Sequence, residues 1–193
     1  LGNNLASKVQ RSSPLQIGAD TTWSKLGAST GGNGGCIKTD GTLWTWGWNE
    51  YGLLGMDNTT DRSSPVQVGT DTTWDNITIS NKLMMGIKTN GTLWAWGFDE
   101  WGDMGLNDDG RDVDKSSPTQ IGTGTDWNKV GATKYTSFAT KTDGSAWSWG
   151  RNENGELGHN DRVAKSSPTQ IPGTSWEEVA GRYLGAMGSQ KAG

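Results

Sequence analysis

Few residues of this sequence have the types and spacing that catalysis or metal binding requires. The single histidine, His159, leaves no Ser-His-Asp arrangement and no histidine cluster. The single cysteine, Cys36, aligns with Gly86 and Ala139 of later repeats, which indicates tight packing rather than reactivity. We therefore expect a protein that is not an enzyme and needs no cofactor or metal, with His159 in a loop.

Carboxylates are more plentiful, and Glu50, Glu100 and Glu153 recur at one position of a repeat. An active site needs different groups that converge, so one carboxylate per repeat argues against catalysis. We expect these side chains to accept backbone N–H bonds in a glycine-rich turn or to remain solvated. The acidic stretch 107–114 offers oxygen ligands for calcium, but it lacks EF-hand spacing and a terminal Glu, so a variable solvated loop is the simpler interpretation.

These residues belong to a unit of about fifty residues that the sequence repeats. A Trp-x-Trp-Gly box lies at residues 44–47, 94–97 and 147–150, and Gly-x-[Asn/Asp]-Glu-x-Gly-x-[Leu/Met]-Gly follows each box. The motif Ser-Ser-Pro-x-Gln-[Ile/Val] begins at Ser12, Ser63, Ser116 and Ser166. Such a period indicates an array whose units cannot bury their apolar faces alone. We therefore predict one array over residues 1–193, with units 1–53, 54–103, 104–156 and an incomplete 157–193.

Within a unit the pattern has the period of β-strands. Extended segments are predicted at 65–68, 74–77, 84–88 and 93–96, the last carrying the box. The pairs Asn-Gly and Asp-Gly before each box predict two-residue hairpins with type I′ turns. The tryptophans expected in the core are Trp23, Trp44, Trp46, Trp74, Trp94, Trp96, Trp127, Trp147, Trp149 and Trp176. Four-stranded sheets with an aromatic face at this period predict an all-β propeller, whereas β-solenoids use shorter coils.

Charge and hydropathy exclude two classes of partner. The formal net charge is −4, and the 17 basic residues form no stripe that could neutralise a row of phosphates, so we expect no nucleic-acid partner. No apolar run approaches the roughly twenty residues of a membrane span, and no signal peptide is visible. We expect no membrane insertion.

The run from Lys38 to Gly55, Lys-Thr-Asp-Gly-Thr-Leu-Trp-x-Trp-Gly-x-Asn-Glu-x-Gly-x-Leu-Gly, resembles the repeat of the regulator of chromosome condensation family. That resemblance implies a seven-bladed β-propeller used mostly as a protein-binding platform. The chain would supply about three and a half blades, as part of a longer propeller or as an arc of a ring closed by another copy. Where the family often has Gln in Gly-Gln-Leu-Gly, this chain has Leu53, Asp103 and Glu156.

Variable positions inside the fixed frame are the candidate binding residues. Large aromatic or Arg residues on turns are typical of interaction hot spots. The alternative is that these side chains fold back to cover a blade edge. The candidates are Trp48, Tyr51, Phe98, Trp101, Arg151 and Asn154.

We expect a non-enzymatic interaction module that binds a protein or a cell-surface glycan. Resemblance to Trp-rich bacterial and phage versions of the repeat implies an extracellular, cell-surface or virion location and a structural or adhesion role. Two alternatives stay open. One is an exchange factor for a small GTPase, and the other is an inhibitor similar to the β-lactamase inhibitor propellers.

Overall fold

The computed structural model describes residues 16–28, 32–108, 113–173, 176–182 and 185–190, and every regular element in these ranges is a β-strand. The first sheet contains β1 (Trp23–Ala28), β2 (Gly34–Lys38), β3 (Leu43–Gly47) and β4 (Arg62–Gln67). The second contains β5 (Trp74–Ile79), β6 (Leu83–Lys88), β7 (Leu93–Gly97) and β8 (Lys115–Gln120). The third contains β9 (Trp127–Ala132), β10 (Thr136–Lys141), β11 (Ala146–Gly150) and β12 (Lys165–Gln170), and β13 (Trp176–Arg182) pairs with β14 (Gly185–Gln190).

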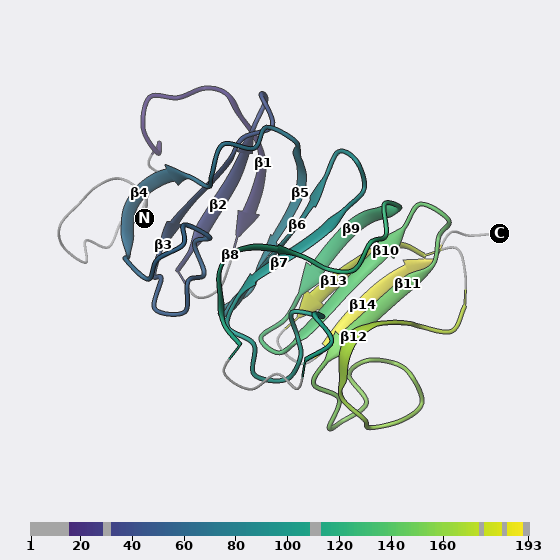
Figure 1. Cartoon of the computed structure of the whole chain (residues 1–193). Helices are drawn as coiled ribbons and strands as arrows, with labels where there is room; N and C mark the ends of the chain where they lie inside the picture. Colours follow the sequence, from purple (N-terminus) through teal and green to yellow (C-terminus); the bar gives the residue numbers. More distant parts are fainter. Residues whose placement is uncertain (1–15, 29–31, 109–112, 174–175, 183–184, 191–193) are drawn as a thin grey trace.

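The sheets are antiparallel and follow one another as successive blades (Figure 1). β5 contacts β1 and β2, β9 contacts β5 and β6, and β13 contacts β9 and β10, so each blade packs its first strand on the face of the preceding one. This arrangement confirms the predicted all-β propeller architecture of four-stranded blades.

Neighbouring blades supply one another's core. Ile77 and Ile79 pack where the glycines Gly27 and Gly35 of the first sheet leave room. Leu26 is 77% exposed, whereas Ile77, at the same position of the next sheet, is 9% exposed. A strand of this repeat therefore buries its central apolar side chain only against a neighbouring blade.

The Ser-Ser-Pro segments close the preceding sheet, so the box strand is third in each blade, and its predicted place as the last strand is wrong. Trp44 pairs with Gln67 and Thr45 with Val66, and the Val68 N–H donates to the Leu43 carbonyl at 2.8 Å. The glycine-rich turn after the box reverses the chain and sends the Ser-Ser-Pro segment back along β3. Proline suits this outer strand because an edge strand does not need every N–H for pairing.

The hairpins before each box also differ from the predicted type I′ turns. Gly41 has φ 79°, but Asp40 has no positive φ, and the same holds for the later pairs. The Gly41 N–H donates to the Lys38 carbonyl and the Lys38 N–H to the Thr42 carbonyl, each at 3.0 Å. This is a three-residue loop with a glycine bulge. The Asp40 carboxylate accepts from the Thr42 N–H and hydroxyl, which favours the longer loop.

Tryptophans occupy the interior of the middle blade. Trp74 makes edge-to-face contacts with Trp94 and Trp96, at centroid distances of 6.2 and 5.7 Å. Trp96 has no exposed surface, while Trp94 is partly buried and donates its indole N–H to the Thr92 hydroxyl. The same edge-to-face arrangement joins Trp127 to Trp147 and Trp149 in the third blade.

Candidate functional site

The turns after the boxes form one structural series, which we call the first turn (47–55), the middle turn (97–105) and the third turn (150–158). In the first turn, Asn49 is fully buried and donates through Nδ2 to the carbonyls of Asn58 and Thr60, at 2.9 and 3.1 Å. Its Oδ1 accepts the Leu54 N–H at 2.8 Å. A buried amide that both donates and accepts therefore fixes this turn.

The third turn uses the same device. Asn152 donates through Nδ2 to the carbonyls of Asp161 and Val163, both at 3.1 Å, and accepts the Leu157 N–H at 3.0 Å. The repetition shows that the Asn of the Gly-x-Asn-Glu motif is a structural group of the turn.

Each turn is also tied to the core of the next blade. The Trp96 indole N–H donates to the Leu53 carbonyl at 2.9 Å, and the Trp149 indole N–H donates to the Asp103 carbonyl at the same distance. A Cβ on Gly97 would lie 3.1 Å from the Leu53 side chain, and one on Gly150 would lie 3.1 Å from the Asp103 Cβ. The turns are thus held in fixed positions relative to one another.

The three turns connect β3 to β4, β7 to β8 and β11 to β12, which are equivalent strands of the three antiparallel sheets. The turns therefore lie on the same side of the array (Figure 1). On that side, Trp48 and Tyr51 of the first turn meet edge to face, with ring centroids 5.2 Å apart. Tyr51 then contacts Phe98 of the middle turn at 4.6 Å. Trp48 is 38% exposed, and Tyr51 and Phe98 are partly buried.

A lysine continues this line of rings. Lys82, from the loop between β5 and β6, places its Nζ 4.0 Å from the centroid of Phe98, 5.7 Å from that of Tyr51 and 5.6 Å from that of Tyr135. Cation–π attraction favours this position. The Glu100 carboxylate pairs with the same ammonium at 3.3 Å.

Arg151 ends the line in the third blade. Its guanidinium lies 5.6 Å from the Trp101 ring centroid and 5.7 Å from that of Tyr135, and it pairs with the Glu153 carboxylate. We call the connected residues the aromatic row. The row consists of Trp48, Tyr51, Phe98, Lys82, Tyr135, Arg151 and Trp101.

The structure brings together five of the residues that the sequence suggested: Trp48, Tyr51, Phe98, Trp101 and Arg151. Asn154 is exposed in the third turn, and its side chain donates to the Glu156 carboxylate at 3.0 Å instead. Among the described residues, no backbone N–H donates to the recurring glutamates. All three are exposed, which agrees with the alternative that they remain solvated, and Glu100 and Glu153 pair with cations of the row.

Sequence reasoning missed Lys82 and Tyr135. Their carbonyls accept the N–H groups of Phe98 and Arg151, at 2.8 and 2.9 Å, so the two residues occupy one position of the repeat, beside the turn. The available signal was a large side chain at this aligned position, immediately before Leu83 and Thr136.

Other chemistry is sparse in the described part of the chain. His159 Nε2 lies 2.9 Å from the Ser148 hydroxyl, and Cys36 is buried, with burial raising the pKa of its thiol to about 11. No group of three or more His, Cys, Asp or Glu among the described residues could hold a metal ion. The described residues also contain no helix long and apolar enough to cross a membrane.

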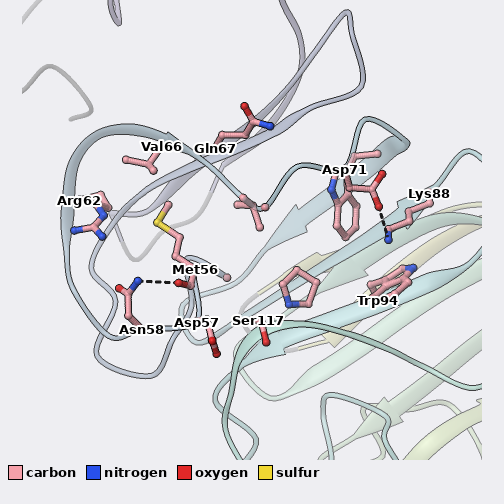
Figure 2. Close-up of a pocket in the computed structure, with 15 residues that line it drawn as sticks. Met56, Asp57, Asn58, Arg62, Val66, Gln67, Asp71, Lys88, Trp94 and Ser117 are labelled. Atoms are coloured by element: carbon pink, nitrogen blue, oxygen red, sulfur yellow. Dashed lines mark hydrogen bonds and ion pairs between the residues drawn. The ribbon is translucent and has the colours of Figure 1, made fainter.

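A cavity of about 540 Å³ lies between β4 and the second blade (Figure 2). Lys88 lies within it, paired with Asp71 at 2.6 Å and 3.6 Å from the Trp94 ring centroid. The first blade repeats this arrangement, with Lys38 paired to Asp20 and lying over Trp44. The repetition indicates that the lysine, the aspartate and the first box tryptophan are structural groups of these two blades.

The model of the regulator of chromosome condensation (RCC1) repeat matches residues 40–78, 90–139 and 143–186. The chain belongs to this family. Among curated proteins, human Protein RCC2 is 43% identical over 49 residues, which are 25% of this chain and 9% of that protein.

Solved structures of low sequence identity share the fold. Prp20p from Saccharomyces cerevisiae, described with its binding to Gsp1p and histones, matches with a TM-score of 0.73 at 19% identity, over 89% of this chain and 44% of that chain. The structure of Kap60 bound to yeast RCC1 (Prp20) matches with a TM-score of 0.78 at 20% identity, over 99% of this chain and 48% of that one. Human WBSCR16 matches with a TM-score of 0.70 at 16% identity, over 82% and 42%. The chain spans less than half the length of each of these relatives.

Proposed function

We propose that this chain is part of a non-enzymatic protein-interaction propeller that binds its partner through the aromatic row. The single observation that carries the proposal is the continuity of the row, which crosses three blades through ring and cation contacts. Rows of Trp, Tyr and Arg on a rigid frame fit the composition of interaction hot spots, because they bury large areas at little entropic cost.

The charges of the row favour a partner segment of low net charge. Lys82 is already paired with Glu100, and Arg151 with Glu153, so a partner would meet mainly the exposed Trp48 and the partly exposed rings beside it. Exposed ion pairs contribute little to binding, whereas fully desolvated aromatic anchors contribute most. A protein segment with apolar side chains therefore fits better than a strongly acidic or basic one.

A phage-displayed library of twelve-residue peptides is the probe that tests this function. Peptides selected on the chain are synthesised, and their Kd is measured on the chain and on three variants, Trp48→Ser, Phe98→Ser and Asn154→Ala. Trp48→Ser should weaken binding at least tenfold, and Asn154→Ala, which changes an exposed residue outside the row, should leave it unchanged. Binding that Trp48→Ser and Phe98→Ser both leave intact would show that the row is not the docking surface.

An exchange factor for a small GTPase is the second candidate. It is favoured only by the likeness in fold to Prp20p, whose described binding partners include Gsp1p. The test is release of a fluorescent guanine nucleotide from a small GTPase in the presence of this chain. Display on a cell surface or virion, and inhibition of a β-lactamase, stay predictions that no described feature favours.

A further inference from the structure

The middle turn lacks the buried amide of its neighbours. Asp99 occupies the position of Asn49 and Asn152, and its side chain is just as buried, with 1% of its surface exposed. Oδ1 of Asp99 lies 3.5 Å from the Met104 nitrogen, in the place where Asn49 accepts from Leu54. Oδ2 of Asp99 is buried and has no hydrogen-bond partner among the described residues.

The chemical difference between the two side chains is a pair of protons. Asn49 Nδ2 supplies two N–H donors to backbone carbonyls, whereas an ionised carboxylate only accepts. A buried anion without donors is strongly unfavourable, and such a group takes up a proton instead. A protonated Asp99 regains one donor at the atom that corresponds to the amide nitrogen.

A second carboxyl lies in the same turn. Asp103 stands where the first turn has Leu53, is 1% exposed, and accepts the N–H groups of Glu100 and Trp101 at Oδ1, at 3.3 and 3.2 Å. The third blade faces it with Gly150 and with the uncharged donors Ser137 and Trp149, which bond its carbonyl. Asp103 therefore ties the segment that carries Trp101 to the interior.

The charged groups around the pair are mainly acidic. Within the described part of the chain, Asp108 acts on Asp99 electrostatically and the Asp114 carboxylate lies 3.3 Å from the Asp99 nitrogen. Lys115 pairs through its backbone with Gly97. Two nearby side chains of the turn surface are engaged elsewhere, because Glu100 pairs with Lys82 and Arg151 pairs with Glu153.

Burial, and secondarily the neighbouring Asp103, raises the pKa of Asp99 to about 8. Burial also raises the pKa of Asp103. Two buried carboxyls that interact electrostatically do not both ionise near neutral pH, because like charges in a poorly solvated site repel. The direction agrees with the geometry, in which a donor is missing at Oδ2 of Asp99.

We propose that Asp99 and Asp103 form a proton-binding site that closes the middle turn at neutral and acidic pH and loosens it in alkaline solution. Loss of the proton leaves two buried carboxylates that repel each other. This repulsion displaces Asp103 from the Glu100 and Trp101 amides, although these N–H groups by themselves favour an ionised acceptor, and frees Phe98 and Trp101 from their places in the aromatic row. This last step rests on the proposed docking function. The proton site itself does not depend on it.

Hydrogen exchange measured by NMR on the whole chain at pH 6 and pH 9 tests the site without any ligand. After correction for intrinsic exchange rates, the protection factor of the Trp101 amide should fall at least tenfold between the two pH values, while that of Leu54 in the first turn stays constant. Asp99→Asn introduces the amide found in the first and third turns and should abolish the decrease in the protection factor of Trp101. Asn49→Asp is the matched reverse exchange and should make the Leu54 amide pH-sensitive.

Equal protection of Trp101 at the two pH values, or an unchanged fall in Asp99→Asn, would overturn the proposal. If Asn49→Asp fails to fold, Asp99→Asn still decides. Repeating the measurement with calcium chloride and then with a chelator separates a proton from a metal, and a chelator-sensitive turn at pH 6 would also overturn it. If Trp48→Ser leaves peptide binding unchanged, that result counts against the docking function and not against the proton-binding site.

Discussion

Trp96, in the box of the second unit, and Trp48, in the turn after the box of the first unit, are the same residue type with different roles. Trp96 has no exposed surface, packs on Trp74 and donates its N–H to the Leu53 carbonyl. Trp48 is 38% exposed and, among the described rings, contacts only Tyr51, with the two ring planes nearly perpendicular. Position in the repeat, on the box strand or in the turn after it, and not residue type, separates a buried tryptophan of the blade from one that a partner can reach.

The largest expected effect is on the building side of this comparison. Trp96→Ala removes a fully buried indole and leaves the Leu53 carbonyl without its donor, so it should lower the free energy of unfolding by roughly 3–5 kcal/mol. Equilibrium denaturation followed by far-UV circular dichroism measures the change. A loss below 1 kcal/mol would show that the two tryptophans are energetically alike.

The buried amides that hold the turns come next. Asn152→Ala removes the donor to the Asp161 and Val163 carbonyls and should cost about 2–3 kcal/mol, since buried polar groups lose their partners. The protection of the Leu157 amide should fall with it, because Asn152 Oδ1 is its acceptor. Asn154→Ala, on the exposed side of the same turn, is the control and should change neither quantity.

The pH dependence should separate the middle turn from its neighbours. Because the pKa of Asp99 is raised to about 8, the folded chain holds a proton that the unfolded chain has released above pH ~4. The free energy of unfolding should therefore fall as pH rises from about 4 to about 8 and then level off. Asp99→Asn should remove this decrease between pH 4 and pH 8, as measured by the midpoints of urea unfolding across the range. An equal decrease of the free energy of unfolding in the variant would assign the pH dependence to other groups.

Carboxylates with lowered pKa values make the free energy of unfolding fall in acid solution. The Lys88 ammonium and the Thr73 hydrogen bonds outweigh burial and hold the pKa of Asp71 at about 2. Stability from this ion pair is present above pH ~4 and is lost as pH falls toward 2. Asp71→Asn should reduce the loss of stability between pH 4 and pH 2, and Asp75→Asn, a change in an exposed ion pair, should not.

The smallest change in stability is expected on the reachable side. Trp48→Ser should cost less than about 1 kcal/mol, because substitutions of exposed side chains away from the core have small effects. In the unsubstituted chain, the fluorescence of Trp48 should nevertheless change when a peptide binds. A melting temperature lowered by more than a few degrees would assign Trp48 to the scaffold.

Repetition made the fold predictable, while pairing between repeats did not follow from it. The period of Trp-x-Trp-Gly and the alternation around it predicted strands close to their observed bounds. The Ser-Ser-Pro segment lies between two sheets in sequence and can pair with either, so its place beside β3 is set by the preceding turn. The loop length of the first Thr-Asp-Gly hairpin is favoured by two hydrogen bonds that Asp40 accepts from Thr42, which composition does not reveal.

The interaction surface was only partly predictable for a related reason. Trp48 and Phe98 stood out because they vary inside a fixed frame. Lys82 joins them through contacts between blades, and sequence position says nothing about which neighbour a long side chain will reach. Asp99 was read as equivalent to Asn49 because the two have the same shape, although only one of them carries donor protons.

The bond from the Trp149 indole to the Asp103 carbonyl connects the middle turn to the core of the third blade. A partner that displaced the middle turn would lengthen this bond and so alter the environment of Trp149 inside the third blade. The emission wavelength of a buried indole depends on its hydrogen bond, so displacement of the middle turn would shift the fluorescence of Trp149 in the next blade.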